Sequence, residues 1–319
     1  MKRILGIWDL TRSGGMLGTL LLLLEELQIQ RQIHDVDGID IIAAGENADQ
    51  IIRGIPLEPI GLIDRVCWNN IKDVTPLIAV LRSMSCVNTL YKCSRSNYYQ
   101  DLLAEIGSSS ILWPSLDALK NETHNYDSTL IIQEHFNNNG SIPHISVNDD
   151  LLKWAKNYLH KKCEGKLSVA VHLKNNINKT GQSIADMDAW KTFFLNCQTK
   201  ERAHFVLIGD DPISEQVRKM PNITIAQEDG FTLDHHLALI QAADLFIGMM
   251  SGPACMAILG TQPYLIFKNP DHHATEMIAE LGDRDHYSFA KPYQRVLRAW
   301  DTPDTLINSF DNMIAEIEA

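Results

Sequence analysis

Short apolar runs alternate with helix-length segments along the first half of the chain. Residues 4–8, 39–44, 87–91 and 111–113 have the length and composition of strands, and residues 17–27 have those of a helix. Strands that are separated by helices form parallel sheets with both faces covered. We therefore expect an α/β domain in this half.

The second half carries the same alternation more clearly. Its apolar runs predict strands at 167–173, 204–208, 223–226, 244–249 and 264–267. Its amphipathic segments predict helices at 187–197, 213–219, 233–242, 253–259 and 274–281. Five strands with intervening helices predict a doubly wound, Rossmann-like sheet.

Turn-forming residues separate the two halves. Residues 137–150 collect asparagine, glycine, serine and a proline, and a helix is predicted directly afterwards at 151–161. A chain of 319 residues is also long enough for two cores. We expect an N-terminal domain at 1–146, a C-terminal domain at 147–301, and a final amphipathic helix within 302–319 that could pack on either domain.

Composition narrows the class of protein. The net charge of −12 argues against nucleic acid as a partner, because affinity for that backbone comes from lysine and arginine. Six cysteines without a CxxC pair are typical of reduced thiols in the cytoplasm. The apolar stretch 16–24, which Glu25 and Glu26 end, is too short to span a bilayer. We expect a cytoplasmic protein; contact with the inner face of a membrane, and the oligomeric state, stay open.

The loop after the first predicted strand offers one candidate for acid–base chemistry. It contains Asp9, followed by Arg12, Ser13, Gly14 and Gly15. Asp9 is the carboxylate placed to take a proton from an acceptor hydroxyl, and the glycines permit close approach of a ligand. The same residues could equally form a turn with a salt-bridged aspartate.

In the second half, polar residues follow the predicted strands, where open parallel sheets bind ligands. These residues are His172, Lys174 and Lys179; Asp210, Asp211 and Glu215; Ser251, Gly252 and Pro253; and His272. The lysines suit a diphosphate, and the Ser-Gly-Pro helix start suits an anion. The acids could bind a ribose or cap a helix, and each loop could also be purely structural. The paired histidines 235–236 and 272–273 point in different directions on a helix, so we expect no metal site.

Two segments resemble the heptosyltransferase family of GT-B glycosyltransferases. They are IPHISVNDDLLKWA at 142–155 and LIQAADLFIGMMSGPA, continuing to GTQP, at 239–263. The resemblance implies two Rossmann-like domains that face a cleft, with a nucleotide-sugar donor on the second and a glycan or lipid-linked acceptor on the first. It further implies inverting displacement without a bound metal or cofactor. Ser251 and Gly252 would then contact the donor phosphates, Lys179 would neutralise them, and Asp210, Asp211 or Glu215 would face the ribose.

The chain departs from the family's pattern at functional positions. Met250 stands where the family has an acid, Cys255 stands where it has a histidine, and Gly15 and Met16 lie near its catalytic acid. A weaker likeness to GT-B fucosyltransferases rests on the segment around His172. Three functions therefore remain: a glycosyltransferase, a nucleotide-sugar epimerase or hydrolase, and a non-catalytic nucleotide-sugar-binding or scaffold protein.

Overall fold

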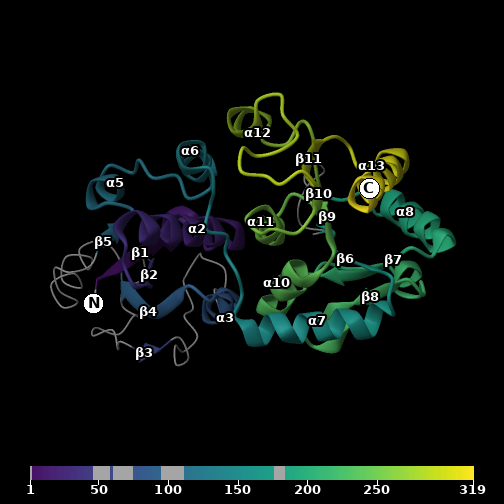
Figure 1. Ribbon diagram of the computed structural model, residues 1–319, viewed down its shortest axis with the longest axis horizontal. Coiled ribbons are helices and arrows are strands. Elements are labelled where there is room, and N and C mark those ends of the chain that lie inside the picture. Colours follow the sequence, from purple (N-terminus) through teal and green to yellow (C-terminus); the bar gives the residue numbers. More distant parts are fainter. Residues whose placement is uncertain (1, 46–57, 60–74, 95–110, 176–183) are drawn as a thin grey trace. The chain divides into compact units, whose positions relative to one another are not determined.

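The computed structural model describes residues 2–45, 58–59, 75–94, 111–175 and 184–319. These residues form two units, 1–148 and 149–319, each with its own sheet (Figure 1). The boundary follows Asn148, whereas the turn-forming residues had placed it after residue 146.

The first unit is built on a sheet whose described strands run in the order β3-β4-β2-β1-β5. Its strands are β1 (Arg3–Asp9), β2 (Gly38–Gly45), β3 (Glu58–Pro59), β4 (Val87–Ser94) and β5 (Ile111–Trp113). Its helices are α1 (Leu10–Ser13), α2 (Leu17–His34), α3 (Thr75–Ser83), α5 (Leu116–Lys120) and α6 (Leu130–Asn139). All pairings are parallel except that of β3 with β4. The predicted strands of this half are therefore present, and α/β is the correct fold class.

Helix α2 is the buried helix of the first unit. Every side chain from Thr19 to Gln30 is buried, including Glu25, Glu26, Gln28 and Gln30 beside the leucines. The helix predicted at 17–27 is therefore present, and it extends beyond Glu25 and Glu26 to His34. Among the described residues, no helix combines the length and apolar character needed to cross a membrane.

The second unit has a larger sheet, ordered β11-β10-β9-β6-β7-β8 and parallel throughout. Its strands are β6 (Leu167–His172), β7 (Ala203–Ile208), β8 (Ile223–Ile225), β9 (Leu245–Met249), β10 (Tyr264–Lys268) and β11 (Gln294–Arg298). Its helices are α7 (Asp149–Cys163), α8 (Met187–Lys200), α9 (Glu215–Arg218), the 3-10 helix η3 (Ala226–Asp229), α10 (Leu233–Ala242), α11 (Gly252–Ile258), α12 (Ala274–Leu281) and α13 (Pro303–Glu318). This is the doubly wound arrangement that the sequence predicted.

Two elements of the second unit differ from the prediction. Strand β11 was missed because it carries Gln294, Arg295 and Arg298 in place of an apolar run. An edge strand tolerates such residues, and the buried Gln294 amide donates to the carbonyl oxygens of Gly260 and Gln262. The helix predicted at 213–219 is the single turn α9, whose cap is the Ser214 hydroxyl and neither Asp210 nor Asp211.

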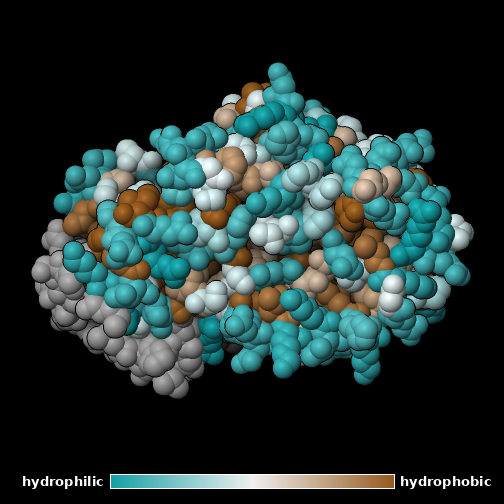
Figure 2. All heavy atoms as spheres, viewed as in Figure 1, coloured by the Kyte–Doolittle hydropathy of each residue, from teal (hydrophilic) through white to brown (hydrophobic). Residues whose placement is uncertain are grey.

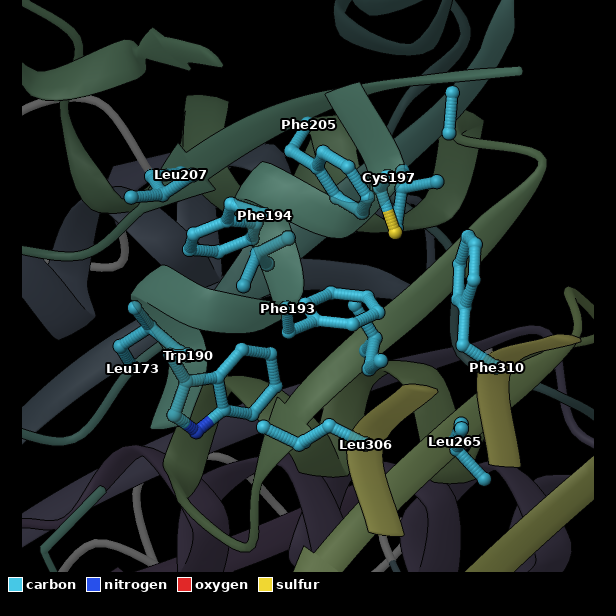
Figure 3. Close-up of a cluster of buried hydrophobic side chains, with 14 of the residues drawn as sticks. Leu173, Trp190, Phe193, Phe194, Cys197, Phe205, Leu207, Leu265, Leu306 and Phe310 are labelled. Atoms are coloured by element: carbon cyan, nitrogen blue, oxygen red, sulfur yellow. The ribbon is translucent and has the colours of Figure 1, made fainter. Parts of the chain in front are cut away.

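An aromatic core joins α8, α13 and one face of the second sheet (Figure 3). Phe193 and Phe194 of α8 pack against Phe205 of β7, and Phe193 also packs against Phe310 of α13. Trp190 packs against Phe193 and against Phe267 of β10. These rings are buried, and the indole nitrogen of Trp190 donates to Asp301 at 2.8 Å, so its polar atom is satisfied. The final helix, which could have packed on either domain, thus completes the core of the second unit.

The helices of the second unit carry charges that suit their ends. Helix α7 has Asp149 and Asp150 in its first turn and three basic residues in its last, an arrangement that complements the helix dipole. Figure 2 shows hydrophilic side chains along the outward face of this helix, at the lower edge of the view. Helix α13 begins with Pro303, and the Thr302 hydroxyl accepts from the Thr305 amide.

Candidate functional site

The order of strands in the second sheet marks where a ligand would bind. Strand β6 is the first of the sheet, and the chain proceeds from it to β7 and β8 on one side, then to β9, β10 and β11 on the other. The reversal occurs between β6 and β9. In open α/β sheets, ligands bind outside the carboxyl ends of the strands at this switch point.

A hydrogen-bonded pair spans the switch point. His172 is the last residue of β6, and Ser251 follows β9 as the N-cap residue of α11. The Ser251 hydroxyl lies 2.9 Å from Nδ1 of His172. Ser251 caps α11 with its backbone only, since its side chain makes no capping bond. The hydroxyl is therefore committed to the imidazole and not to the helix.

Two glycines make room for His172, one beside its backbone and one beside its ring. A Cβ on Gly248 of β9 would lie 2.4 Å from the backbone oxygen of His172, and backbone atoms cannot give way. A Cβ on Gly209, after β7, would lie 2.8 Å from the His172 ring, and Gly209 has a positive φ of 95°. The lack of side chains at both positions lets the strands close around His172.

Acids and a second histidine face the other side of His172. Its Nε2 lies 3.7 Å from a carboxylate oxygen of Asp211. His236 of α10 accepts the Gly209 amide at Nδ1, while its buried Nε2 has no hydrogen-bond partner among the described residues. Burial lowers the pKa of His172 and of His236 to about 4, and Lys174 adds to the effect at His172. Both rings are therefore neutral at pH 7.

Strand β10 contributes a cation that sequence reasoning missed. Lys268, its last residue, is only 7% exposed, and its Nζ lies 2.8 Å from Nδ1 of His272. A lysine directly after four apolar strand residues was the available signal, because buried lysines are uncommon. His272, which sequence reasoning selected, thus lies beside Lys268.

The other residues of the second unit that the sequence selected lie at different distances from the His172–Ser251 pair along the chain and in different surroundings. Asp210 is exposed, and its charge acts on both His172 and His236. Glu215 forms an exposed ion pair with Lys219 at 3.0 Å. Gly252 and Pro253 begin α11 next to Ser251, and Lys174 follows β6. Lys179 lies outside the described residues.

The candidate loop of the first unit forms an internal ion pair. Asp9, at the end of β1, is 6% exposed, and its carboxylate lies 3.6 Å from Nε of Arg12. Arg12 also pairs with Glu122 at 3.1 Å. The buried Ser13 hydroxyl accepts from the Gly15 amide, and Gly14 and Gly15 both have positive φ angles, so the loop turns back before α2. This is the salt-bridged turn that was one of the two interpretations of Asp9.

Behind that loop, α2 buries two carboxyl groups. Glu25 accepts from the backbone amide of His144 at 2.8 Å, and Glu26 accepts from the Trp113 indole at 2.8 Å. Burial raises the pKa of Glu25 to about 7 and that of Glu26 to about 8. His124, 3.5 Å from Glu26, has its pKa lowered to about 4 by burial.

Comparisons with known proteins identify the fold. No protein-family model and no curated protein sequence matches the chain. Among solved structures, the chain is similar to the glycosyl transferase family 9 protein from Veillonella parvula, with a TM-score of 0.57, 12% identity, and coverage of 99% of this chain and 97% of that one.

Two E. coli enzymes match over similar lengths. ADP-heptose LPS heptosyltransferase II gives a TM-score of 0.51 at 11% identity, and heptosyltransferase WaaC with ADP-2-deoxy-2-fluoro heptose gives 0.50 at 11% identity; both matches cover 99% of this chain and 100% of the other. Identities this low speak to the fold alone. The chain therefore shares its two-sheet α/β fold with family 9 glycosyltransferases and ADP-heptose heptosyltransferases, as its sequence resemblance implied.

Proposed function

We propose that this protein is a glycosyltransferase that moves a sugar from a nucleotide diphosphate donor to a hydroxyl group of a glycan or lipid-linked acceptor. The observation that carries the proposal is the His172–Ser251 pair, which lies at the switch point of the second sheet. The solved structures of the same fold include one with ADP-2-deoxy-2-fluoro heptose, a nucleotide-sugar analogue.

The second unit would hold the diphosphate of the donor. Ser251 offers a hydroxyl after β9. Lys268 and Lys174 bring positive charge to the ends of β10 and β6, the two strands that flank β9. Positively charged hydrogen-bond donors bind phosphate oxygens strongly. They also stabilise the negative charge that develops on the departing diphosphate. We assign Lys179 the same role on the basis of the sequence resemblance. Asp210 and Asp211 follow β7, where a ribose hydroxyl could reach them.

The first unit would supply the base. Asp9 ends β1 of a sheet in which β1 lies between β2 and β5, so it occupies the switch point of that sheet. Its pairing with Arg12 fixes the carboxylate in one orientation. A base of this kind takes the acceptor proton during inverting displacement, and we propose that the reaction proceeds without a metal ion.

Two residues favour a second candidate function, a non-catalytic nucleotide-sugar-binding or scaffold protein. Met250 and Cys255 replace the acid and the histidine of the family's pattern, and the Cys255 thiol contacts the Ser251 carbonyl oxygen at 3.7 Å. A protein that lost those two groups could retain the phosphate site and lose transfer. An epimerase or hydrolase would differ again, because it would consume the donor without an acceptor.

A ligand screen followed by a turnover assay tests the proposal. Thermal unfolding of the full chain is measured with ADP, GDP and UDP and with their sugar conjugates, for the wild type, Ser251→Ala and Lys268→Met. A nucleotide at about 100 times its Kd should stabilise the wild type by roughly 2.7 kcal/mol. We expect one base to give this shift and both variants to weaken it.

Turnover then separates the three functions. Release of the nucleoside diphosphate that requires an added acceptor supports a transferase. Release without any acceptor supports a hydrolase, and conversion of the donor into another nucleotide sugar supports an epimerase. Nucleotide binding with neither release nor conversion of any donor conjugate supports the scaffold function. If none of the nucleotides shifts the unfolding temperature, the proposed donor site is wrong.

A further inference from the structure

Three side chains at the carboxyl edge of the second sheet form a chain of polar contacts. Asp211 follows β7, His172 ends β6, and Ser251 follows β9. Their atoms are in series: the Asp211 carboxylate lies 3.7 Å from Nε2 of the imidazole, and Nδ1 lies 2.9 Å from the Ser251 hydroxyl. The imidazole thus connects a carboxylate to the hydroxyl of the proposed phosphate site.

The protons along these contacts do not suffice for phosphate binding when His172 is neutral. A neutral His172 carries one N–H, and the Asp211 carboxylate favours that proton on Nε2. Nδ1 then accepts the hydroxyl proton of Ser251. In that state Ser251 has no proton left for a phosphate oxygen, which can only accept hydrogen bonds. An imidazolium removes the conflict, because Nδ1–H donates to Ser251 and the hydroxyl proton becomes available.

We propose that a nucleoside diphosphate binds to the second unit together with one proton, which His172 takes up, so that Ser251 can donate to the phosphate. This inference rests on the proposed function, since it concerns the same phosphate site. His172 acts here as a positioning residue: it contacts Ser251 and not the ligand. The proton enters with the nucleotide and leaves with it, so one complete turnover leaves His172 unchanged.

The charges around His172 set its state before the ligand arrives. Burial opposes the charged ring, and Lys174 and His236 of α10 oppose it further, whereas Asp210 favours it and Asp211 faces Nε2. These groups come from the loops after β6 and β7 and from α10. The uncharged Ser251, at the start of α11, lies on the remaining side. The net effect keeps the ring neutral near pH 7. A bound diphosphate adds negative charge on the Ser251 side and favours the imidazolium.

The same sheet offers a matched control at its opposite edge. His204, near the start of β7, is also buried, its pKa is lowered mainly by burial, and its Nε2 lies 2.8 Å from the Thr224 hydroxyl. It reproduces the imidazole–hydroxyl pair away from the carboxyl ends of the strands. Ligand binding at those ends should leave His204 unaffected.

Isothermal titration of the full chain with ADP, or with GDP or UDP if the screen selects that base, measures the proton directly. Titrations at one pH in two buffers of different ionisation enthalpy give the number of protons taken up. His172→Asn keeps a donor in the place of Nδ1–H but cannot titrate, and His204→Gln keeps one in the place of Nε2. The ionisation of the nucleotide itself is the same in titrations of the wild type and both variants, so it cancels in the comparison.

We expect the wild type and His204→Gln to take up about one proton more than His172→Asn at pH 7. His172→Asn should bind within a few-fold of the wild type, because it still donates to Ser251. Wild-type affinity should rise as the pH falls from 8 to 6, by at most about tenfold per unit, and that of His172→Asn should rise less.

Three results would overturn the inference. Equal proton uptake by the wild type and His172→Asn, with tight binding by both, would reject His172 as the proton acceptor and leave the glycosyltransferase proposal intact. Loss of the extra proton in His204→Gln as well would show that the effect is not specific to this edge of the sheet. Absence of binding by ADP, GDP and UDP would instead reject both proposals.

Discussion

Burial shifts the pKa of two glutamates of α2 in the first unit and of two histidines at the carboxyl edge of the sheet in the second. Glu25 and Glu26 are buried within a helix and pair with a backbone amide and an indole. His172 and His236 lie among loops at the switch point. Burial favours the uncharged form in both cases, yet that form is the protonated one for a glutamate and the deprotonated one for a histidine.

The two units should therefore respond to pH in opposite directions. A raised carboxyl pKa gives stability that is present at low pH and is lost as the pH rises through the folded-state value. A lowered imidazole pKa gives stability that is present above the unfolded value and is lost as the pH falls toward the folded-state value. The buried ionisable groups thus lie in a helix of the first unit and at the carboxyl edge of the sheet in the second.

The largest expected effect separates the chemical roles of the units. Asp9→Asn should lower kcat for sugar transfer by about 10² to 10⁴-fold, because it removes the proposed base. It should leave the Kd for the nucleoside diphosphate unchanged, since Asp9 belongs to the first unit. Steady-state rates and calorimetric Kd values for the same preparation test both statements.

The matched variant in the second unit is Ser251→Ala, which should weaken nucleotide binding by about tenfold through the loss of one hydrogen bond to a charged group. Full transfer activity in Asp9→Asn would assign Asp9 to the structural ion pair with Arg12 alone. An unfolding scan of both variants distinguishes lost chemistry from lost folding.

The next largest effect, a loss of stability in Phe193→Ala, tests whether the cores of the two units unfold independently. Phe193 lies fully buried among rings of α8, β7 and α13, so Phe193→Ala should destabilise the second unit by about 3–5 kcal/mol. Amide hydrogen exchange should rise in β7 and α13 and stay unchanged in α2. Equal increases in α2 would mean that the two units unfold as one.

Alkaline pH should weaken the first unit selectively. Glu25 and Glu26 have pKa values raised to about 7 and about 8, so their contribution is present below pH 4.5 and is lost as the pH rises through 7 to 8. Between pH 6 and pH 9 we expect the first unit to lose a few kcal/mol, seen as faster amide exchange in α2.

The double variant Glu25→Gln, Glu26→Gln retains oxygens that accept from the His144 amide and the Trp113 indole. It should remove most of the pH dependence of exchange in α2 between pH 6 and pH 9, after correction for the intrinsic rate. If the dependence persists in the variant, other groups cause it.

The last effect, of similar size, is the reverse trend in the second unit. The pKa values of His172 and His236, lowered to about 4 from 6.5, predict that stability is complete above pH 6.5 and falls between pH 6.5 and 4. We expect a loss of a few kcal/mol between pH 7 and 5, about 2 kcal/mol for each histidine. Exchange in β6 should then rise more than in α2. Among the described residues of the first unit, His124 also has a lowered pKa and acts in the same direction. Equal rises would contradict the contrast.

The sequence predicted most of the second sheet because its strands are uninterrupted apolar runs, which suit burial on both faces. It failed for β11, whose Gln294 and arginines conceal a strand at the sheet edge. It also did not indicate what Glu25 and Glu26 pair with, because their partners lie 119 and 87 residues away in the sequence. No local pattern can reveal such partners.

The candidate site shows the same limit. His172 was selected because it lies near the end of a predicted strand, and Ser251 because it follows one. Only the strand order places these residues, 79 positions apart, within hydrogen-bond distance. Lys268 was missed because the predicted strand ended one residue earlier. The ion pair of Asp9 with Arg12 was one of two interpretations that the sequence left open.

The position of α13 has a consequence for synthesis on the ribosome. The first unit is continuous in sequence, so its core can form while the second is still being translated. Phe193 and Phe205, in contrast, face a gap until Phe310 has left the exit tunnel, because α13 completes their cluster. For seconds at ordinary elongation rates, the nascent second unit presents aromatic surface to chaperones. Nascent chains stopped before residue 303 should therefore bind chaperones longer than chains stopped after residue 148.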